Sequence, residues 1–505
     1  MLGLTLGAAR LGRVATAAVN TRSAPLRVAI YGDSFGQRGQ DITGSPNGVD
    51  AAAVDPQTGR WPSDLTNRVG GVQWGFSPWL DALSGGMFTA PYQTNRAIGG
   101  FNTGQLSRLS ASDPTPWYLA DFRSFLLTQA ATPLAPDCVI LQAGTNDGVT
   151  AFSAATTYAN ILKICQQITG LGLPVFVATI LPRGHAGSTA ERLASDRITW
   201  CNDANALLIA GLAAEPSLAG RVRVIDPRAS FRDLSGQAND ILPAMVYDGL
   251  HLSVAGCRIL ARAYLAAMSA YFGVTMVGHL PTGASYVANG LMSGTGGTVT
   301  RSGNAASNAG FTISGTAPTG WTVTTTLNGG ATAWNGTSPS NITGTVIVAR
   351  QTAALGEAIV ITADCVASGL TNANTRAIEA FCAVTLPSTT ELPVGAWFRG
   401  LAVVELSAHK GCRGVSAELR LAEPDGTTRI LRSCGPAPNG TANMTLDPAV
   451  GFFGADRLIL QTPPRIRKAG SYGVIEFAIL LYFAGQAAEC DGVLTISQAG
   501  VVAAP

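Results

Sequence analysis

Residues 26–36 read LRVAIYGDSFG, and this stretch decides the fold expected for the first half of the chain. Its first six residues are a short, mostly apolar run of the kind that forms a buried strand of a parallel sheet. Gly32 and Gly36 flank the residues that follow and let the backbone turn sharply. Parallel sheets place their sites at this carboxyl edge, so Ser34 is a candidate reactive residue. On its own, the motif also describes an ordinary strand-ending turn.

Further apolar runs follow the same pattern and alternate with helical segments. The predicted strands cover residues 138–142, 175–180 and 222–225. Amphipathic stretches with apolar residues at three- and four-residue spacing cover 155–169 and 190–213. Strands and helices in turn predict an α/β domain over residues 26–278, in which a parallel sheet is covered by helices on both faces.

Length and composition limit the partners that we expect. A chain of 505 residues is too long for one ordinary hydrophobic core, so its length predicts two or three domains. Only 13% of its residues are charged, which is little for a free surface and favours a homo-oligomer. The formal net charge of +2, without a long basic run, gives no reason to expect a nucleic-acid partner. No run of apolar residues is long enough for a membrane span.

The N-terminus and the cysteines also have plain interpretations. Residues 1–25 are an N-terminal extension, interpreted as an assembly anchor. Their first apolar stretch precedes Arg10 and Arg13, the reverse of a secretory signal, so we expect no cleaved export signal. The nine cysteines are scattered and never form a CxxC pair. We interpret them as buried small hydrophobic residues, not as a zinc site or a disulfide framework.

The composition changes after residue 278. From 280 to 349 the only charged residue is Arg301, and turn signals such as Asn289-Gly290 recur. We expect a small β-rich module over 279–350, or part of a larger one, or alternatively a flexible linker. From 351 to 505 a period-two alternation predicts a β-sandwich, with a jelly roll as one form of it. Such domains can bind glycans or mediate assembly, but the fold does not fix the function.

Two more blocks are expected at the sheet edge that carries Ser34. Residues 95–100 read NRAIGG, and the adjacent Gly99 and Gly100 allow a backbone N–H to face a ligand. Residues 141–148 read LQAGTNDG and bring the Asn146 amide to the same edge. Alone, the first block is a turn, and Asn146 could instead cap a helix.

The fourth block, YDGLHLS over residues 247–253, combines an acid and a histidine. Ser253 is a plausible N-cap for a helix that runs to about residue 271, which places Asp248 and His251 in the preceding loop. An Asp three residues before a His can turn back to the imidazole and fix its tautomer. A lone His is usually structural. The other three histidines are His185, His279 and His409, and none of them has an acid three residues before it. Only His251 therefore has the spacing that a catalytic pair needs.

Together the four blocks GDSF, the Gly-Gly turn, GTND and DGLH resemble the SGNH (GDSL-like) hydrolase family over about half of the chain. The resemblance implies a flavodoxin-like fold and a serine esterase that needs no metal or organic cofactor. It implies Ser34 as the nucleophile, with His251 as general base and Asp248 as its orienting partner.

The resemblance also implies an oxyanion hole. Its donors would be the backbone N–H groups of Ser34 and Gly100 and the side chain of Asn146, with Gly99 as the alternative second donor. Asp33, Gly99 and Asp147 are further candidates for substrate contact.

One departure from the family concerns the segment after the nucleophile. Residues 36–74 are rich in Gly, Asn, Asp and Pro and are predicted to form a long loop, with the next helix deferred to 78–83. Trp61 and Trp74 are predicted to wall the substrate cleft, which suits a sugar face better than a fatty chain. We therefore expect an acylated polysaccharide as substrate, with acetyl or another small acyl group.

A different class of function is also compatible with the sequence. The leading Leu-Gly repeat, 1–12, resembles N-termini of phage-like virion proteins, and the low charge suits an oligomeric spike. The chain would then be a spike subunit at a virion surface or in another extracellular setting. It would contact virion partner proteins and host capsule, with the hydrolase domain active or kept as a binding scaffold.

Overall fold

The computed structural model divides the chain into two compact units, which are described separately. Unit 1 comprises residues 1–40, 47–63 and 75–276, and unit 2 comprises residues 41–46, 64–74 and 277–505. The structure describes residues 26–37, 40–41, 71–73, 75–90, 94–109, 119–132, 135–218, 220–246, 248–274, 286–287, 289–301, 311–327, 342–367, 376–426, 428–434, 457–462, 465–483, 489 and 491–504.

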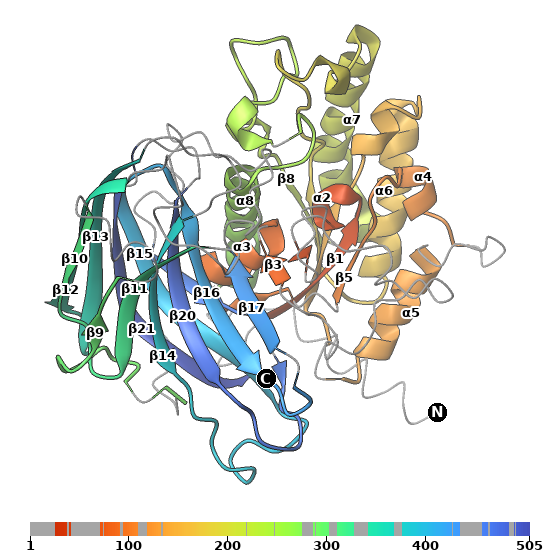
Figure 1. The fold of residues 1–505 in the computed structure, drawn as a ribbon. Coiled ribbons are helices and arrows are strands. Elements are labelled where there is room, and N and C mark those ends of the chain that lie inside the picture. Colours follow the sequence, from red (N-terminus) through yellow and green to blue (C-terminus); the bar gives the residue numbers. More distant parts are fainter. Residues whose placement is uncertain are drawn as a thin grey trace. The chain divides into compact units, whose positions relative to one another are not determined.

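A parallel sheet forms the middle layer of unit 1 (Figure 1). Its strands are β1 (Leu26–Gly32), β4 (Phe88–Thr89), β5 (Asn95–Ala97), β6 (Cys138–Gln142), β7 (Val175–Ala178) and β8 (Val222–Ile225). They run in the order β4-β1-β6-β7-β8, with β5 also paired to β1, and the pairs are parallel. Strands β6 and β7 are buried throughout, as continuous apolar runs covered on both faces should be.

Helices cover both faces of this sheet (Figure 1). One face carries α5 (Leu119–Gln129), α6 (Ala154–Thr169) and α7 (Ser195–Ala214), and the other carries α3 (Phe76–Leu83) and α8 (Val254–Phe272). The short helices α2 (Ser34–Gln37) and α4 (Thr103–Leu106) and the 3-10 turns η4 (Thr145–Gly148), η5 (Thr189–Glu191), η6 (Pro216–Leu218), η7 (Arg228–Ser230) and η8 (Pro243–Met245) lie in the connections.

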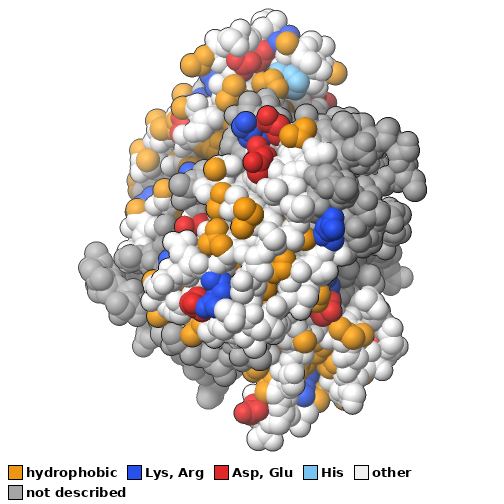
Figure 2. Space-filling model, turned by 60° about the vertical axis from the view of Figure 1, so that its left-hand side comes forward, with side chains coloured by type: hydrophobic (Ala, Val, Ile, Leu, Met, Phe, Trp, Pro, Cys, Tyr) orange, Lys and Arg blue, Asp and Glu red, His pale blue; other side chains and the backbone are white. Residues whose placement is uncertain are grey.

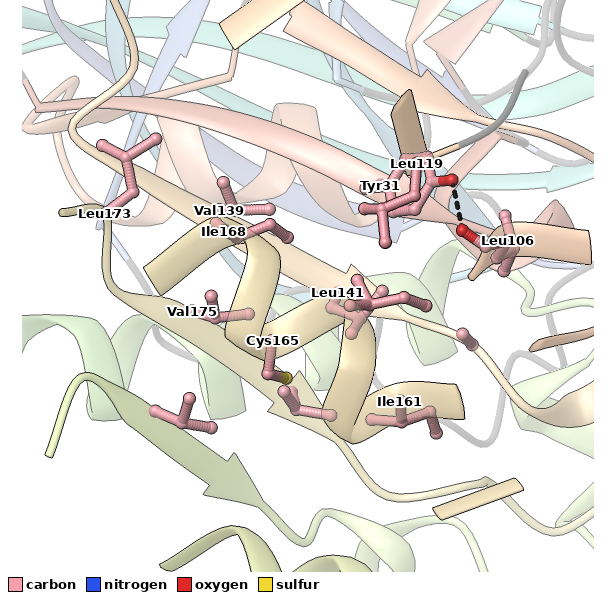
Figure 3. Packing of buried hydrophobic residues seen from close by; sticks show 14 of the residues in the cluster. Tyr31, Leu106, Leu119, Val139, Leu141, Ile161, Cys165, Ile168, Leu173 and Val175 are labelled. Atoms are coloured by element: carbon pink, nitrogen blue, oxygen red, sulfur yellow. Dashed lines mark hydrogen bonds between the residues drawn. The ribbon is translucent and has the colours of Figure 1, made fainter. Parts of the chain in front are cut away.

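Alternate residues of the strands build the core on the α6 side of the sheet. Figure 3 shows Val139 and Leu141 of β6 packed with Ile161 of α6, all fully buried. The buried hydroxyl of Tyr31 donates a hydrogen bond to the carbonyl oxygen of Leu106 at 2.8 Å, which satisfies the polar end of an otherwise apolar side chain. This core fixes β1, and with it the position at which β1 ends.

The opposite face packs against α3 and α8. The Phe176 ring of β7 meets the edge of Tyr271 at a centroid distance of 5.6 Å. Phe76 of α3 stacks on Tyr264 of α8 with centroids 5.4 Å apart. Helix α8 is thus anchored on the sheet, which determines where the loop before it can lie.

The fold class predicted for unit 1 is confirmed. Strands β6 and β8 have the predicted bounds, whereas α7 begins at Ser195, later than predicted, because residues 189–191 form the 3-10 turn η5. Ser253 caps α8 as expected, with its hydroxyl oxygen accepting the N–H of Gly256 at 3.2 Å. No helix of the described residues is both long and apolar enough to cross a membrane.

Unit 2 is built from two mixed β-sheets (Figure 1). Its strands are β2 (Gln40–Asp41), β3 (Gly71–Gln73), β9 (Thr298–Val299), β10 (Phe311–Gly315), β11 (Trp321–Leu327), β12 (Ile342–Thr352), β13 (Glu357–Ala367), β14 (Arg376–Ala383), β15 (Trp397–Lys410), β16 (Cys412–Ala422), β17 (Thr428–Cys434), β18 (Arg457–Gln461), β19 (Arg465–Ile466), β20 (Ile475–Phe483) and β21 (Asp491–Ala504). One sheet has the order β10-β12-β13-β21-β15-β18, with β19 on β15, and the other has the order β2-β3-β17-β16-β20-β14-β11-β9.

The two sheets of unit 2 face each other as a sandwich. A side chain added at Gly400 of β15 would overlap the ring of Phe477 of β20, so the sheets touch at this point. At one end, Arg465 Nε of β19 donates to Glu423 Oε1, just after β16, at 2.6 Å, and both side chains are buried. The β-sandwich prediction agrees with this architecture.

Two expectations about the organisation of the chain need correction. Residues 279–350 do not form a separate module or a linker throughout; their described strands are part of a larger β-module, because β10 and β12 belong to the same sheet as β13. The segment 36–74 is not a loop throughout, because β3 pairs in parallel with β17, with Gly71 opposite Leu431. The pairing of β3 with β17 has no local signal, since it joins two segments that are distant in sequence.

The sparse charge and the scattered cysteines of the sequence can be followed in the described residues. Figure 2 shows one face on which acidic and basic side chains are sparse and intermixed among uncharged atoms. Among the described residues, six cysteines are free and buried, as expected: Cys138, Cys165, Cys201, Cys257, Cys365 and Cys382. Burial raises the pKa of the Cys201 thiol to about 11, although nearby Arg228 and Arg183 lower it.

Candidate active site

Ser34 lies where β1 ends and α2 begins. The backbone turns here because Gly32 adopts a φ of +144° and leaves no room for a side chain against the backbone of Gln142. As the first residue of α2, Ser34 presents a backbone N–H that has no partner within the helix. The Asn95 side chain supports this turn by donating from Nδ2 to the carbonyl oxygen of Gly36 at 2.9 Å.

The imidazole of His251 lies between Ser34 and Asp248. Its Nε2 is 2.9 Å from Ser34 Oγ, and its Nδ1 is 2.7 Å from Asp248 Oδ2. The other oxygen of Asp248 accepts the N–H groups of Leu250 at 3.0 Å and His251 at 2.7 Å. The spatial relation expected between the serine and the histidine is therefore present.

The Asp248 carboxylate stays ionised at neutral pH. Burial opposes its ionisation, but hydrogen bonds from the ring and the backbone N–H of His251 outweigh that cost and lower the pKa of Asp248 to about 2. A carboxylate at Nδ1 makes that nitrogen the proton donor, so Nε2 of the neutral ring is free to accept the proton of Ser34.

A neighbouring loop braces the segment that carries Asp248. The N–H of Gly184 donates to the carbonyl oxygen of Gly249 at 2.7 Å, and the Ser188 hydroxyl donates to that of Asp248 at 3.3 Å. Gly249 has a φ of +85°, and a side chain there would overlap Ser188. The positive φ and the close approach of the Ser188 side chain thus favour glycine at this position.

The remaining blocks place hydrogen-bond donors on the same edge. Gly100 lies in the turn closed by Phe101 N and the carbonyl oxygen of Ile98, with a φ of +82° that favours glycine. A Cβ built on Gly100 meets no atom within 4 Å, so this position faces open space. Asn146 Nδ2 donates to the carbonyl oxygen of Phe101 at 2.9 Å. An amide nitrogen has two N–H bonds, so one remains for a ligand.

Comparison with known protein families identifies the region of the chain that contains these residues. Residues 31–259 match the model of the GDSL-like lipase/acylhydrolase family. This region is a GDSL-like acylhydrolase domain. The matched residues contain Ser34, Asp248 and His251, so the acylhydrolase domain carries the whole constellation.

The solved structures that match the chain cover about half of it. A GDSL-like lipase from Bacteroides thetaiotaomicron is 18% identical, with 48% of this chain and 88% of that chain covered and a TM-score of 0.30. A catalytic mutant of an acetylxylan esterase from Geobacillus stearothermophilus is 16% identical, with 51% and 98% covered and a TM-score of 0.30. A lipase/acylhydrolase from Enterococcus faecalis is 17% identical, with 50% and 100% covered and a TM-score of 0.28. No curated protein matched the chain.

Two predicted substrate contacts in the acylhydrolase domain are corrected by their burial. Asp33 is fully buried behind Ser34, where its Oδ1 accepts the N–H of Phe35 at 3.1 Å. Asp147 is also fully buried, with its carboxylate engaged by Thr103 and Thr157. Both side chains therefore support the fold around the site. A helix-capping role for Asn146 is also wrong, because Gly144 holds the N-cap position of η4.

The other predicted contacts are only partly placed. Gly99 is half-buried in the turn beside Gly100. Trp61 and Trp74 lie outside the described residues, so their predicted role stays a prediction.

Sequence reasoning missed two arginines that hold the Asn146 turn of the acylhydrolase domain. Arg183 donates from Nη1 to the carbonyl oxygen of Thr145 at 3.3 Å and from Nη2 to Glu191 at 2.6 Å. Arg197 of α7 donates to the carbonyl oxygens of Asp147 at 2.8 Å and Gly148 at 2.9 Å. No local pattern marks these residues, because each reaches the turn from a distant segment.

Proposed function

We propose that the acylhydrolase domain is a serine esterase that removes acetyl or other small acyl groups from a polysaccharide. His251 Nε2 accepts the proton of Ser34 Oγ while that oxygen attacks the ester carbonyl carbon. Asp248 holds the ring in the required tautomer and stabilises the imidazolium that forms. The contact of 2.9 Å between Ser34 Oγ and His251 Nε2 is the observation that carries this proposal.

The oxyanion of the tetrahedral intermediate is stabilised by three donors in this mechanism. They are the backbone N–H groups of Ser34 and Gly100 and the second N–H of the Asn146 amide. The hydrogen bond from Asn146 to Phe101 aligns the amide before substrate binds, so little reorganisation is needed during the reaction.

Collapse of the intermediate breaks the ester bond and leaves an acyl group on Ser34. His251 gives its proton to the departing sugar oxygen, which leaves as a hydroxyl. A water molecule then attacks the acyl carbonyl with His251 again accepting the proton, and the acid is released as Ser34 regains its hydroxyl hydrogen.

The experiment for the esterase compares the wild-type protein with Ser34→Ala on p-nitrophenyl acetate. We expect release of p-nitrophenol by the wild type and a rate at background for the variant. Circular dichroism checks that both are folded. Hydrolysis by a folded Ser34→Ala variant would remove the assignment of the nucleophile.

The choice of a polysaccharide rests on the sequence beside the nucleophile. The segment 36–74 is polar and contains Trp61 and Trp74, a combination that suits the hydroxyl and C–H faces of a sugar. The β-sandwich of unit 2 supports the same substrate class, since such domains can bind glycans. Acetate released from an O-acetylated polysaccharide, measured against the deacetylated polymer as control, tests this choice.

A second candidate function is that of a spike or fibre subunit at a virion surface. The low content of charged residues, 13%, and their sparse distribution on the face in Figure 2 favour a homo-oligomer or virion partner proteins. Such an extracellular subunit would bind host capsule through the same chain. Pull-down of capsular polysaccharide by the Ser34→Ala variant tests binding, and binding without acetate release by the wild type would favour a scaffold.

A further inference from the structure

Asp147 sits directly after Asn146 and points into the protein. Its carboxylate accepts three hydrogen bonds from two other elements. Oδ1 accepts the N–H of Thr103 at 2.7 Å, and Oδ2 accepts the hydroxyls of Thr103 at 2.5 Å and Thr157 at 2.7 Å. Thr103 begins α4 and Thr157 lies in the first turns of α6, so one buried side chain joins η4 to both helices.

Asn146 joins η4 to the segment before α4 a second time. Its Nδ2 donates to the carbonyl oxygen of Phe101, two residues before Thr103. Adjacent residues of η4 therefore bind both sides of Asn102, immediately after the turn that presents Gly100. A connection at two points restrains both rotation and translation of η4 relative to the start of α4.

The residues around Asp147 are joined by further hydrogen bonds. Asn102 and Gln105 form a reciprocal capping box at the start of α4, with contacts of 2.9 and 3.0 Å. Asn160 of α6 donates from Nδ2 to the hydroxyl oxygen of Thr103 at 3.0 Å, which leaves that hydroxyl hydrogen for Asp147. The N–H and the hydroxyl of Thr103 thus each have a defined hydrogen-bond partner.

The charge of Asp147 is offset within the protein. Burial raises the pKa of Asp147, while the hydrogen bonds of Thr103 and Thr157 and the positive charge of Arg197 counteract this rise. Arg197 also binds the backbone of the turn itself. These partners reduce the rise in pKa without cancelling it, so the charge of the carboxylate is only partly compensated.

We propose that Asp147 is a positioning residue that fixes the Asn146 side chain and the Gly100 N–H relative to each other. The inference rests on the proposed esterase function, in which both groups bind the oxyanion. Asp147 does not touch the substrate. Its loss should let the two donors drift apart, which weakens transition-state stabilisation more than substrate binding.

The test uses the full chain and compares Asp147→Ala with Asp137→Ala. Asp137 also accepts a backbone N–H, that of Arg27 at 2.8 Å, but it lies where β1 and β6 begin, at the opposite edge of the sheet from Ser34. We expect kcat for p-nitrophenyl acetate to fall about 100-fold in Asp147→Ala with KM changed less than about threefold, because a donor displaced by about 1 Å costs this much. Asp137→Ala should keep the wild-type kcat.

A second measurement follows the covalent step alone. Diethyl p-nitrophenyl phosphate phosphorylates an active serine and places a phosphoryl oxygen in the oxyanion hole. Its inactivation rate should fall in parallel with kcat in Asp147→Ala. Asp147→Asn keeps an acceptor for the Thr103 N–H and should recover part of the loss, to within about tenfold of the wild type. Thermal denaturation of every variant separates folding from positioning.

The outcomes are distinct. A folded Asp147→Ala variant with wild-type kcat and inactivation rate would overturn the inference, as would an equal loss of kcat in Asp137→Ala. If Asp147→Ala does not fold, Thr157→Val removes one hydrogen bond at nearly constant shape and should lower kcat about fivefold without a change in KM. An unchanged kcat in that variant would then overturn the inference. A folded wild-type protein that is inert toward both reagents would instead overturn the proposed function, and with it this role.

Discussion

Nε2 of His251 and Oγ of Ser34 lie 2.9 Å apart although 217 positions separate them in sequence. Two independent features of unit 1 produce this contact. Strand β1 is fixed in the sheet and delivers Ser34 at its carboxyl end, and α8 is packed on the same sheet by aromatic contacts, which sets the loop before it. The hydrogen bond joins the ends of two elements that the core has already placed.

Replacing Asp248 with Asn should nearly abolish turnover. The Asn amide can present its N–H₂ to Nδ1 of His251, which would stabilise the tautomer with the proton on Nε2, and that tautomer cannot accept the proton of Ser34. We expect kcat for p-nitrophenyl acetate to fall by roughly three to four orders of magnitude, as for related triads. Steady-state kinetics check this. A loss of less than tenfold would mean that Asp248 does not govern the tautomer.

Truncating Asn146 should cost transition-state stabilisation. Asn146→Ala removes one oxyanion donor and should lower kcat by about two to three orders of magnitude, or about 3 to 4 kcal/mol. KM should change little, because the donor acts on the intermediate and not on the ground state. A rise in KM with an unchanged kcat would place Asn146 in substrate binding instead.

Asp33 should make the free energy of unfolding depend on pH. Burial raises the pKa of Asp33 to about 7, against the opposing hydrogen bond from the Phe35 N–H. Because the folded pKa lies above the unfolded one, the folded state binds more protons between about pH 4 and 7. The free energy of unfolding should therefore fall as pH rises through this window, by up to about 4 kcal/mol from this group alone.

The Asp33→Asn variant provides the measurement. Urea denaturation at a series of pH values should show a variant whose stability relative to the wild type increases from pH 4 to pH 8. A difference between the two proteins that stays constant with pH would show that Asp33 titrates normally.

Gly32 and Gly220 form a matched pair for the cost of a side chain at positive φ. Both have positive φ, but a Cβ on Gly32 would overlap the backbone of Gln142, whereas a Cβ on Gly220 meets no atom within 4 Å. Gly220→Ala should cost about 1 to 2 kcal/mol, the price of the left-handed conformation. Gly32→Ala should cost more than about 4 kcal/mol, because it also forces β1 and β6 apart. Similar melting temperatures for the two variants would contradict the steric argument.

The sequence predicted the parallel sheet of unit 1 well because most of its strands are short, mostly apolar runs. The run at 138–142 shows this, since periodicity and the glycine that follows determine both its bounds and its edge. The direction in which an individual side chain points was harder to predict. Asp33 and Asp147 each adjoin a residue of the site, yet both point into the interior, and adjacency in sequence does not reveal which way a turn rotates a side chain. The pairing of β3 with β17 could not be predicted for a different reason, since backbone hydrogen bonds between distant segments depend little on residue type.

The position of β3 has a consequence for cutting and recombining this gene. The chain enters the fold of unit 1, contributes residues 64–74 to unit 2 and returns to unit 1 at residue 75. A fragment that starts at residue 277 would lack a strand that adjoins β17, and one that stops at residue 276 would carry that strand without its sheet. The two units are therefore interleaved in the linear sequence, so neither can be exchanged as a simple cassette.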